Sequence, residues 1–261
     1  MVTQNSLILR RIGLTEMANN KALGQHWLKN RAILDDIATE AGEGELCLEI
    51  GPGLGTLTSS LLKRFTKVLA VEFDKKLADN LPKSFPGKNL EVVNADFLKF
   101  DLEGIKGSYI VAGNIPYYIT SPIIEKLITA QNRPKRIVLL MQKEVAERIV
   151  SEKESVLSLM VKNRAEVRAG MVVLRDEFTP PPKVDSQVLI LEPKAPEVDD
   201  NVFKIIKLGF VAPRKKLIHN LEPLKPKKDL EAIFEKLGID KNARPADLHL
   251  KDYEQLFQNM I

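Results

Sequence analysis

A glycine-rich stretch that follows an apolar run constrains the fold of this chain most strongly. The run Leu46 to Ile50 ends at Gly51-Pro52-Gly53-Leu54-Gly55, and residues 56–65 then have helical spacing. A short apolar run that ends at glycines is typical of a buried parallel strand. Glycines at such a place let the chain turn tightly and approach a ligand closely. The stretch therefore predicts a nucleoside-binding site at the end of a strand.

Strands and helices alternate through the first 150 residues. The expected strands after the first are 68–72, 90–93, 109–112 and 137–141, and the expected helices are 33–41, 56–65, 74–81, 121–130 and 143–150. A helix is then expected at 155–165, and strands at 166–174 and 184–191 with no helix between them. This order predicts an α/β protein with a mostly parallel seven-stranded sheet and an antiparallel edge hairpin.

A Pro- and acid-rich linker at 192–200 separates this region from three or four expected helices in 201–261. We therefore expect a ligand-binding domain over 1–193, with a basic N-terminal arm in 1–31, and a small helical domain over 194–261. The only cysteine is Cys47, which excludes an intrachain disulfide and a cysteine-based zinc cluster. No apolar run reaches membrane-spanning length and no signal peptide is evident, so we expect a cytoplasmic protein. We also expect no metal site.

Acidic residues near the glycines indicate the kind of ligand. Glu72 ends the next expected strand, 21 residues after Gly51, and is placed to accept hydrogen bonds from ribose hydroxyls. The order Gly-x-Gly-x-Gly after Glu49 differs from the Gly-x-Gly-x-x-Gly of dinucleotide sites. A buried carboxylate there suits cationic S-adenosylmethionine better than a pyrophosphate. Asp96, after the third strand, is equally suited to accept from the adenine amine or to cap a turn.

The segment Asn114-Ile115-Pro116-Tyr117 follows the fourth expected strand. An exocyclic amine on adenine is a poor nucleophile because its lone pair is delocalised into the ring. The Asn114 side-chain oxygen and the Ile115 carbonyl can accept its hydrogen bonds, and Tyr117 offers a flat face for the base. The alternative is a simple strand-ending turn. A nicotinamide-dependent dehydrogenase shares the strand–glycine–helix order but leaves this segment unexplained.

Positive charge is concentrated in residues 201–228, where eight basic side chains against one acidic side chain give a net charge of +7. The whole chain carries only +4. A charge run is usually a solvated surface, but this density favours contact with phosphates. The densest cluster, and our predicted phosphate-binding group, is Arg214, Lys215 and Lys216.

The whole chain resembles the ribosomal RNA adenine dimethyltransferases. The matching stretches are Lys21 to Leu28, Glu49 to Leu57, Asn94 to Leu98, Asn114 to Pro122, Phe178 to Ser186 and Phe210 to Leu221. The resemblance implies a Rossmann-like class I methyltransferase that uses S-adenosylmethionine for two successive transfers to each target adenine. It implies cofactor contacts from His26, Leu28, Gly51, Glu72, Asp96 and Asn114. It also implies that Asn114 and Tyr117 hold the target base, with Phe178 as a second stacking face.

This chain departs from the family pattern in two places. Trp27 stands where phenylalanine is usual, and the 150–156 loop is shorter than usual and lacks a Gly-rich, Tyr-containing stretch.

The family has several branches, and residues 210–216 and 242–248 look most like the small-subunit branch. That branch modifies two adjacent adenosines near the 3′ end of 16S ribosomal RNA during ribosome assembly. The expected partner is thus the ribosomal RNA of a small-subunit precursor, bound by a monomer. The alternatives are a large-subunit methyltransferase that confers macrolide resistance and a non-catalytic RNA-binding assembly factor. Intact Glu72, Asp96 and Asn114 count against a pure binder, which has no need of a donor pocket.

Overall fold

The computed structural model describes residues 26–260, so most of the predicted N-terminal arm lies outside it. The chain divides into two compact units. Of the described residues, the first unit comprises 26–146 and 168–193, and the second comprises 147–167 and 194–260. This division differs from the predicted domains in one respect, because 147–167 belong to the second unit. The physical reason is that Leu159 packs into the core of the C-terminal helices.

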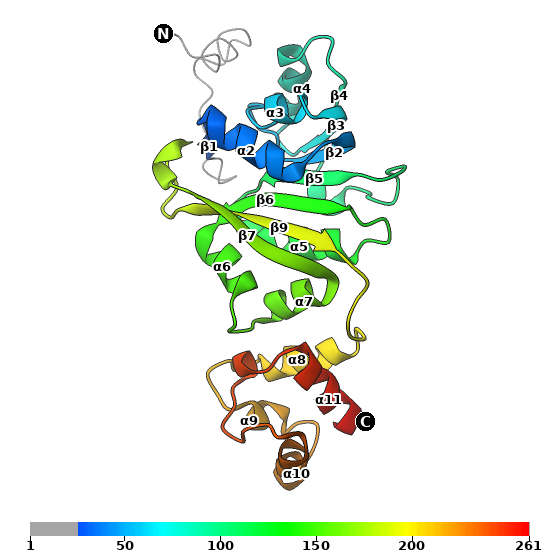
Figure 1. The fold of residues 1–261 in the computed structure, drawn as a ribbon, viewed down its shortest axis with the longest axis vertical. Helices are drawn as coiled ribbons and strands as arrows, with labels where there is room; N and C mark the ends of the chain where they lie inside the picture. The colour runs from blue at the N-terminus through cyan, green and yellow to red at the C-terminus, as the bar shows by residue number, and fades with distance from the viewer. Residues whose placement is uncertain (1–25, 261) are drawn as a thin grey trace. The chain divides into compact units, whose positions relative to one another are not determined.

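A seven-stranded sheet forms the centre of the first unit, in the order β4-β3-β2-β5-β6-β9-β7 (Figure 1). Strands β4, β3, β2, β5 and β6 pair in parallel, and β9 runs antiparallel to β6. The strands are β2 (Gly44–Ile50), β3 (Phe65–Glu72), β4 (Leu90–Asn94), β5 (Ile110–Asn114), β6 (Arg136–Gln142), β7 (Ala165–Val173) and β9 (Ser186–Pro193). The α/β fold with an antiparallel edge, predicted from the sequence, is confirmed.

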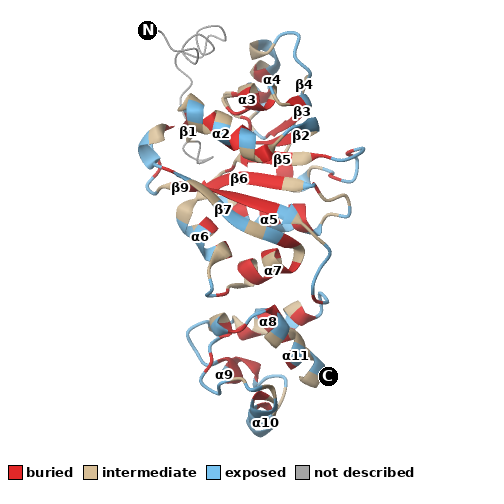
Figure 2. Cartoon of the chain, viewed as in Figure 1, coloured by how far each residue is buried: buried red, intermediate tan, exposed pale blue. Residues whose placement is uncertain are grey.

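Helices connect these strands and complete the core. They are α2 (Arg31–Ala41), α3 (Thr58–Leu61), α4 (Lys75–Ser84), α5 (Thr120–Thr129) and α6 (Lys143–Val150), which extends across the division between the units. Asn30 caps α2 and Asp74 caps α4 by accepting hydrogen bonds from backbone N–H groups of the first turn. The middle residues of β6, from 137 to 141, are fully buried (Figure 2). This explains why β6 reads as a continuous apolar run.

Two local features differ from the sequence-based expectations. Helix α3 has only four residues, whereas a ten-residue helix was expected at 56–65, because turns follow the glycine loop and Phe65 already belongs to β3. A second, two-stranded sheet pairs β1 (Trp27–Leu28) with β8 (Phe178–Thr179) in antiparallel orientation. This small sheet places residues 26–28 beside the ends of the large sheet's strands.

The second unit is helical. Its helices are α7 (Val156–Arg164), α8 (Val202–Gly209), α9 (Leu217–Leu221), α10 (Lys227–Leu237) and α11 (Leu250–Met260). They enclose an apolar core of their own, with Phe234 and Tyr253 almost completely buried. Within 26–260, no helix is long and apolar enough to cross a membrane.

Candidate functional site

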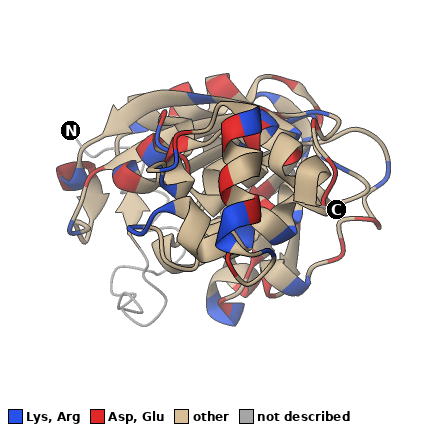
Figure 3. Ribbon diagram, turned by 90° about the horizontal axis from the view of Figure 1, so that it is seen from below, with Lys and Arg blue, Asp and Glu red and all other residues tan. Residues whose placement is uncertain are grey.

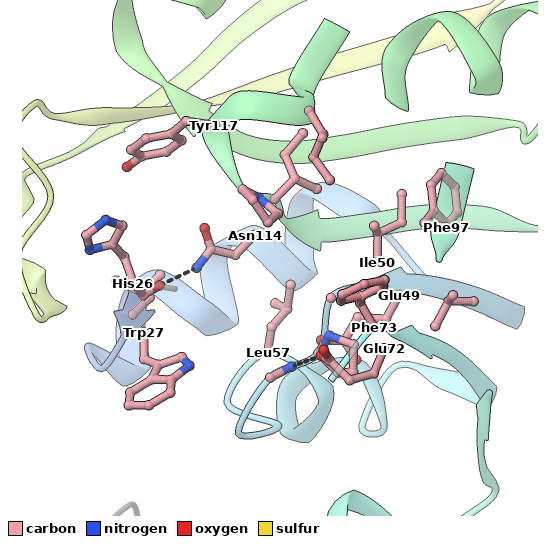
Figure 4. Close-up of a pocket in the computed structure, with 18 of the residues that line it drawn as sticks. His26, Trp27, Glu49, Ile50, Leu57, Glu72, Phe73, Phe97, Asn114 and Tyr117 are labelled. Atoms are coloured by element: carbon pink, nitrogen blue, oxygen red, sulfur yellow. Dashed lines mark hydrogen bonds between the residues drawn. The ribbon is translucent and has the colours of Figure 1, made fainter. Parts of the chain in front are cut away.

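A cavity lies at the carboxyl ends of β2, β3 and β5 (Figure 4). Its walls come from segments far apart in the sequence: 26–28, 49–53, 71–73, 95–98 and 114–119. Open α/β sheets bind ligands at this edge because parallel strands all end there. The cavity gathers most of the predicted site residues, namely His26, Leu28, Gly51, Glu72, Asp96, Asn114 and Tyr117.

The glycine loop forms one wall of the cavity. Gly51 and Gly53 have φ angles of 64° and 57°, a region that favours glycine. The Gly51 N–H donates to the Val71 carbonyl at 3.0 Å, which ties the turn to β3. A Cβ atom on Gly51 would meet nothing within 4 Å, so the space beside this backbone is open. The loop is therefore a cradle in which a ligand can lie against the main chain.

Glu72 is held rigidly beside this cradle. One of its carboxylate oxygens accepts from the Gly53 N–H and the other from the Asp74 N–H, each at 2.9 Å. The side chain is only 5% exposed, and burial raises the pKa of Glu72. A carboxylate has about four lone-pair sites, so two fixed bonds leave capacity to accept from ligand hydroxyls.

Glu49 supplies a second carboxylate, and it is 1% exposed. Burial raises its pKa to about 8. Its Oε2 atom has no hydrogen-bond partner in the described part of the chain, although the residue lines the cavity. A cation placed here would satisfy this oxygen and favour the charged form of the carboxyl group. The site therefore fits S-adenosylmethionine, which carries a sulfonium and an ammonium, and disfavours a pyrophosphate.

Asp96 caps a turn, which is one of the two roles that the sequence left open. Its Oδ1 accepts from the Leu98 N–H at 3.0 Å and caps the short 3₁₀ turn Phe97–Lys99. The residue also lines the cavity. Capping engages one carboxylate oxygen, so it is compatible with a ligand contact through the other.

Asn114, at the end of β5, is oriented by the segment that contains β1. Its Nδ2 donates to the backbone carbonyl of His26 at 3.0 Å (Figure 4). A carbonyl can only accept, so this bond fixes which end of the amide faces His26. In Figure 4 the Asn114 oxygen points away from the His26 carbonyl and toward the side of the cavity where Tyr117 lies. The amide therefore presents an acceptor to the cavity.

Tyr117 lies against His26 and is fixed at its hydroxyl. The two rings are stacked, with centroids 6.0 Å apart and planes inclined by 22°. The hydroxyl forms a 2.8 Å hydrogen bond with the Ser186 hydroxyl. His26 is itself anchored, because its Nδ1 donates to the Pro180 carbonyl at 2.8 Å. These contacts hold the predicted base-binding ring in place.

Phe178, the expected second stacking face, is buried in this structure. The side chain is 3% exposed, packs in the hydrophobic core and does not line the cavity. Its position in β8, paired with Leu28, accounts for this burial. The described structure therefore does not bring Phe178 and Tyr117 together as two faces of one base site.

Two exposed aromatic side chains on the cavity wall were not predicted. Phe73 is 62% exposed and Tyr118 is 64% exposed, and both line the cavity. Each directly follows a predicted site residue, Glu72 or Tyr117, and this adjacency was the only available signal. Large exposed rings beside a cavity are suited to stacking on planar ligands.

The predicted basic cluster lies in the second unit. Arg214, Lys215 and Lys216 are all exposed and precede α9, and Lys216 donates to the Asn242 side chain at 2.6 Å. Figure 3 shows where the basic side chains (blue) and the acidic side chains (red) lie along the ribbon. Over residues 26–260, no group of three or more His, Cys, Asp or Glu is arranged to hold a metal ion.

Comparisons of sequence identify relatives of this chain. The family model "Ribosomal RNA adenine dimethylase" matches residues 16–261. "Ribosomal RNA small subunit methyltransferase A" of Nostoc sp. is 39% identical over 259 residues, covering 90% of this chain and 96% of that protein. The protein of the same name from Mycoplasmopsis synoviae is also 39% identical, over 91% of this chain and 95% of that protein.

Comparisons of structure agree with those of sequence. A dimethyladenosine transferase from Plasmodium falciparum matches with a TM-score of 0.76 and 31% identity, covering 88% of this chain and 96% of that one. The 23S rRNA methyltransferase ErmE matches with a TM-score of 0.73 and 28% identity, covering 90% of this chain and 99% of that one. The chain therefore belongs to the ribosomal RNA adenine dimethylase family, the enzymes that dimethylate adenine in ribosomal RNA with S-adenosylmethionine as methyl donor.

Proposed function

We propose that this enzyme dimethylates the exocyclic amines of two adjacent adenosines near the 3′ end of 16S ribosomal RNA. We propose further that it acts on a small-subunit precursor, in the cytoplasm, as a monomer. The main support for the proposed chemistry is the fixed amide of Asn114. Its oxygen faces the same cavity that the glycine loop lines. The small-subunit target is supported by the names of relatives with up to 39% identity.

The donor side of the site consists of three carboxylates and the glycine cradle. Glu72 accepts from the ribose hydroxyls, and Glu49 faces the positive charge of the donor. Asp96 accepts from the adenine amine through the oxygen that does not cap the 3₁₀ turn. Gly51, Leu28 and His26 line the same space. The bound donor supplies an electrophilic methyl group, and the residues of this chain orient it.

The base side of the site makes a poor nucleophile reactive. The Asn114 oxygen and the Ile115 carbonyl accept from the adenine amine, which keeps the lone pair out of conjugation and directed at the methyl group. Tyr117 supports the ring of a base that has left its stack. The amine sheds its proton after attack, so no base is required beforehand. Arg214, Lys215 and Lys216 contact RNA phosphates and hold the substrate.

A direct test is methylation of purified ribosomal subunits that lack the modification, with labelled S-adenosylmethionine. We expect label in two adjacent dimethyladenosines of the small-subunit RNA and none in the large-subunit RNA, measured by mass spectrometry of nuclease fragments. Label in the large-subunit RNA alone would instead assign the chain to the activity named for ErmE. An Asn114→Ala variant tested on the same particles reports on the mechanism separately from the target.

A further inference from the structure

Trp27 is the only tryptophan in the chain, and it lies in β1 on the wall of the donor cavity. Its Nε1 is buried and has no hydrogen-bond partner in the part of the chain that the structure describes. The nitrogen faces the glycine loop, because a Cβ atom built on Gly53 would lie 3.5 Å from it. Figure 4 shows this nitrogen on the side of the indole that faces the cavity.

A buried N–H without a partner is costly, by roughly 1–3 kcal/mol. Buried tryptophan N–H groups therefore usually find an acceptor. A phenylalanine, usual at this place in the family, would fill the site without that cost. The cost of the buried indole N–H is removed if a bound ligand supplies a hydrogen-bond acceptor.

Among the described residues that line the cavity, two buried side-chain atoms lack a hydrogen-bond partner, and they are of opposite kind. Glu49 Oε2 is an acceptor, and Trp27 Nε1 is a donor. The amino-acid end of S-adenosylmethionine carries one group for each of them, an ammonium and a carboxylate. The ammonium can only donate hydrogen bonds, so it belongs beside the Glu49 oxygen, where its positive charge also stabilises the charged form of that carboxyl group. The carboxylate can only accept hydrogen bonds, so it belongs beside the Trp27 N–H.

We infer that the Trp27 indole N–H donates a hydrogen bond to the carboxylate of the methyl donor and so selects for an intact amino-acid group. Trp27 is then a binding residue of the donor site and not merely a packing residue. The inference rests on the identity of the donor and is independent of which ribosomal RNA is the target.

The test measures by calorimetry, without RNA, how tightly wild type and a Trp27→Phe variant bind two ligands, S-adenosylmethionine and its decarboxylated form. Trp27→Phe removes the N–H and keeps an aromatic ring. S-adenosylmethionine should bind the variant about tenfold more weakly, the size expected for one bond to a charged group. Decarboxylated S-adenosylmethionine, which lacks the carboxylate, should bind both proteins equally. An equal loss for both ligands would mean that Trp27 acts only by packing, and no loss for either would also overturn the inference.

The fluorescence of the native protein provides a second measurement that needs no variant. Because Trp27 is the only tryptophan, its emission reports on this site alone. S-adenosylmethionine should shift or quench the emission, and decarboxylated S-adenosylmethionine at saturation should do so clearly less. Equal changes with the two ligands, or no change with either, would contradict a bond to the carboxylate.

Discussion

Donor affinity should rise with pH because of Glu49. Burial raises the pKa of this carboxyl group to about 8, so in the donor-free protein at pH 7 about nine in ten molecules carry the proton. A cation beside Glu49 favours the charged form and lowers this pKa. Binding must then release a proton, and between pH 6 and pH 7 the affinity should increase by nearly tenfold. This window lies below the pKa of an α-amino group, about 7.7–8.0, so the donor itself stays charged.

Calorimetry in two buffers of different ionisation enthalpy measures both the affinity and the protons released. The matched control is Glu49→Gln, which keeps the shape and cannot titrate. The other ionisable side chains that line the cavity remain in this variant, namely His26, Glu72, Asp96, Tyr117 and Tyr118. The variant should lose the slope with pH. An equal slope in wild type and Glu49→Gln, or no proton release in wild type, would refute the assignment of Glu49 to the cationic part of the donor.

The same group affects stability in the opposite direction when no donor is bound. The pKa of Glu49 in the folded state lies above its ordinary value of 4.5, so its contribution to stability is complete below pH 4.5 and is lost as pH rises through 8. The limiting slope for one such group is about 1.4 kcal/mol per pH unit. Glu49→Gln should therefore unfold at a higher denaturant concentration than wild type at pH 8, and the difference should shrink toward pH 5.

Three further predictions concern the other site residues. Asn114→Ala should slow single-turnover methylation by at least ~100-fold, roughly 2.7 kcal/mol, with little loss of RNA affinity, and an unchanged rate would exclude the proposed orientation of the amine. Glu72→Ala should weaken donor binding in calorimetry by about 1–3 kcal/mol, because it removes the ribose acceptor and releases the Gly53 N–H. Replacing Arg214, Lys215 and Lys216 with neutral residues should weaken RNA binding and flatten its dependence on salt, while donor affinity stays constant, and an unaltered salt slope would show that the cluster is only a solvated surface.

The sequence predicted the parts of the site that follow directly from strand ends. Glu72 closes β3 and Asn114 closes β5, and parallel strands carry their last residues to one edge. The glycine loop was found for the same reason. These signals are local, because an apolar run, a glycine and a polar residue follow one another within a few positions.

The features that sequence reasoning missed depend on contacts between distant residues. The β1–β8 pair joins residues about 150 positions apart, and two-residue strands are too short to show periodicity. The burial of Phe178 follows from that pairing, so a lone phenylalanine before a proline-rich stretch gave no indication of it. The exposure of Phe73 and Tyr118 is likewise set by what surrounds the cavity and not by their own segments.

The β1 segment links the donor and base halves of the site. In the proposed mechanism Asn114 faces the base. Its amide is oriented by the carbonyl of His26, and the neighbouring residue Trp27 lines the same cavity. His26 is in turn anchored to the Pro180 carbonyl. An Asn114→Asp change would set a carboxylate oxygen against the His26 carbonyl, where the native amide donates a bond. Acceptor capacity alone is therefore not sufficient at position 114: the side chain must donate to one side and accept from the other, and among similarly sized side chains asparagine does both.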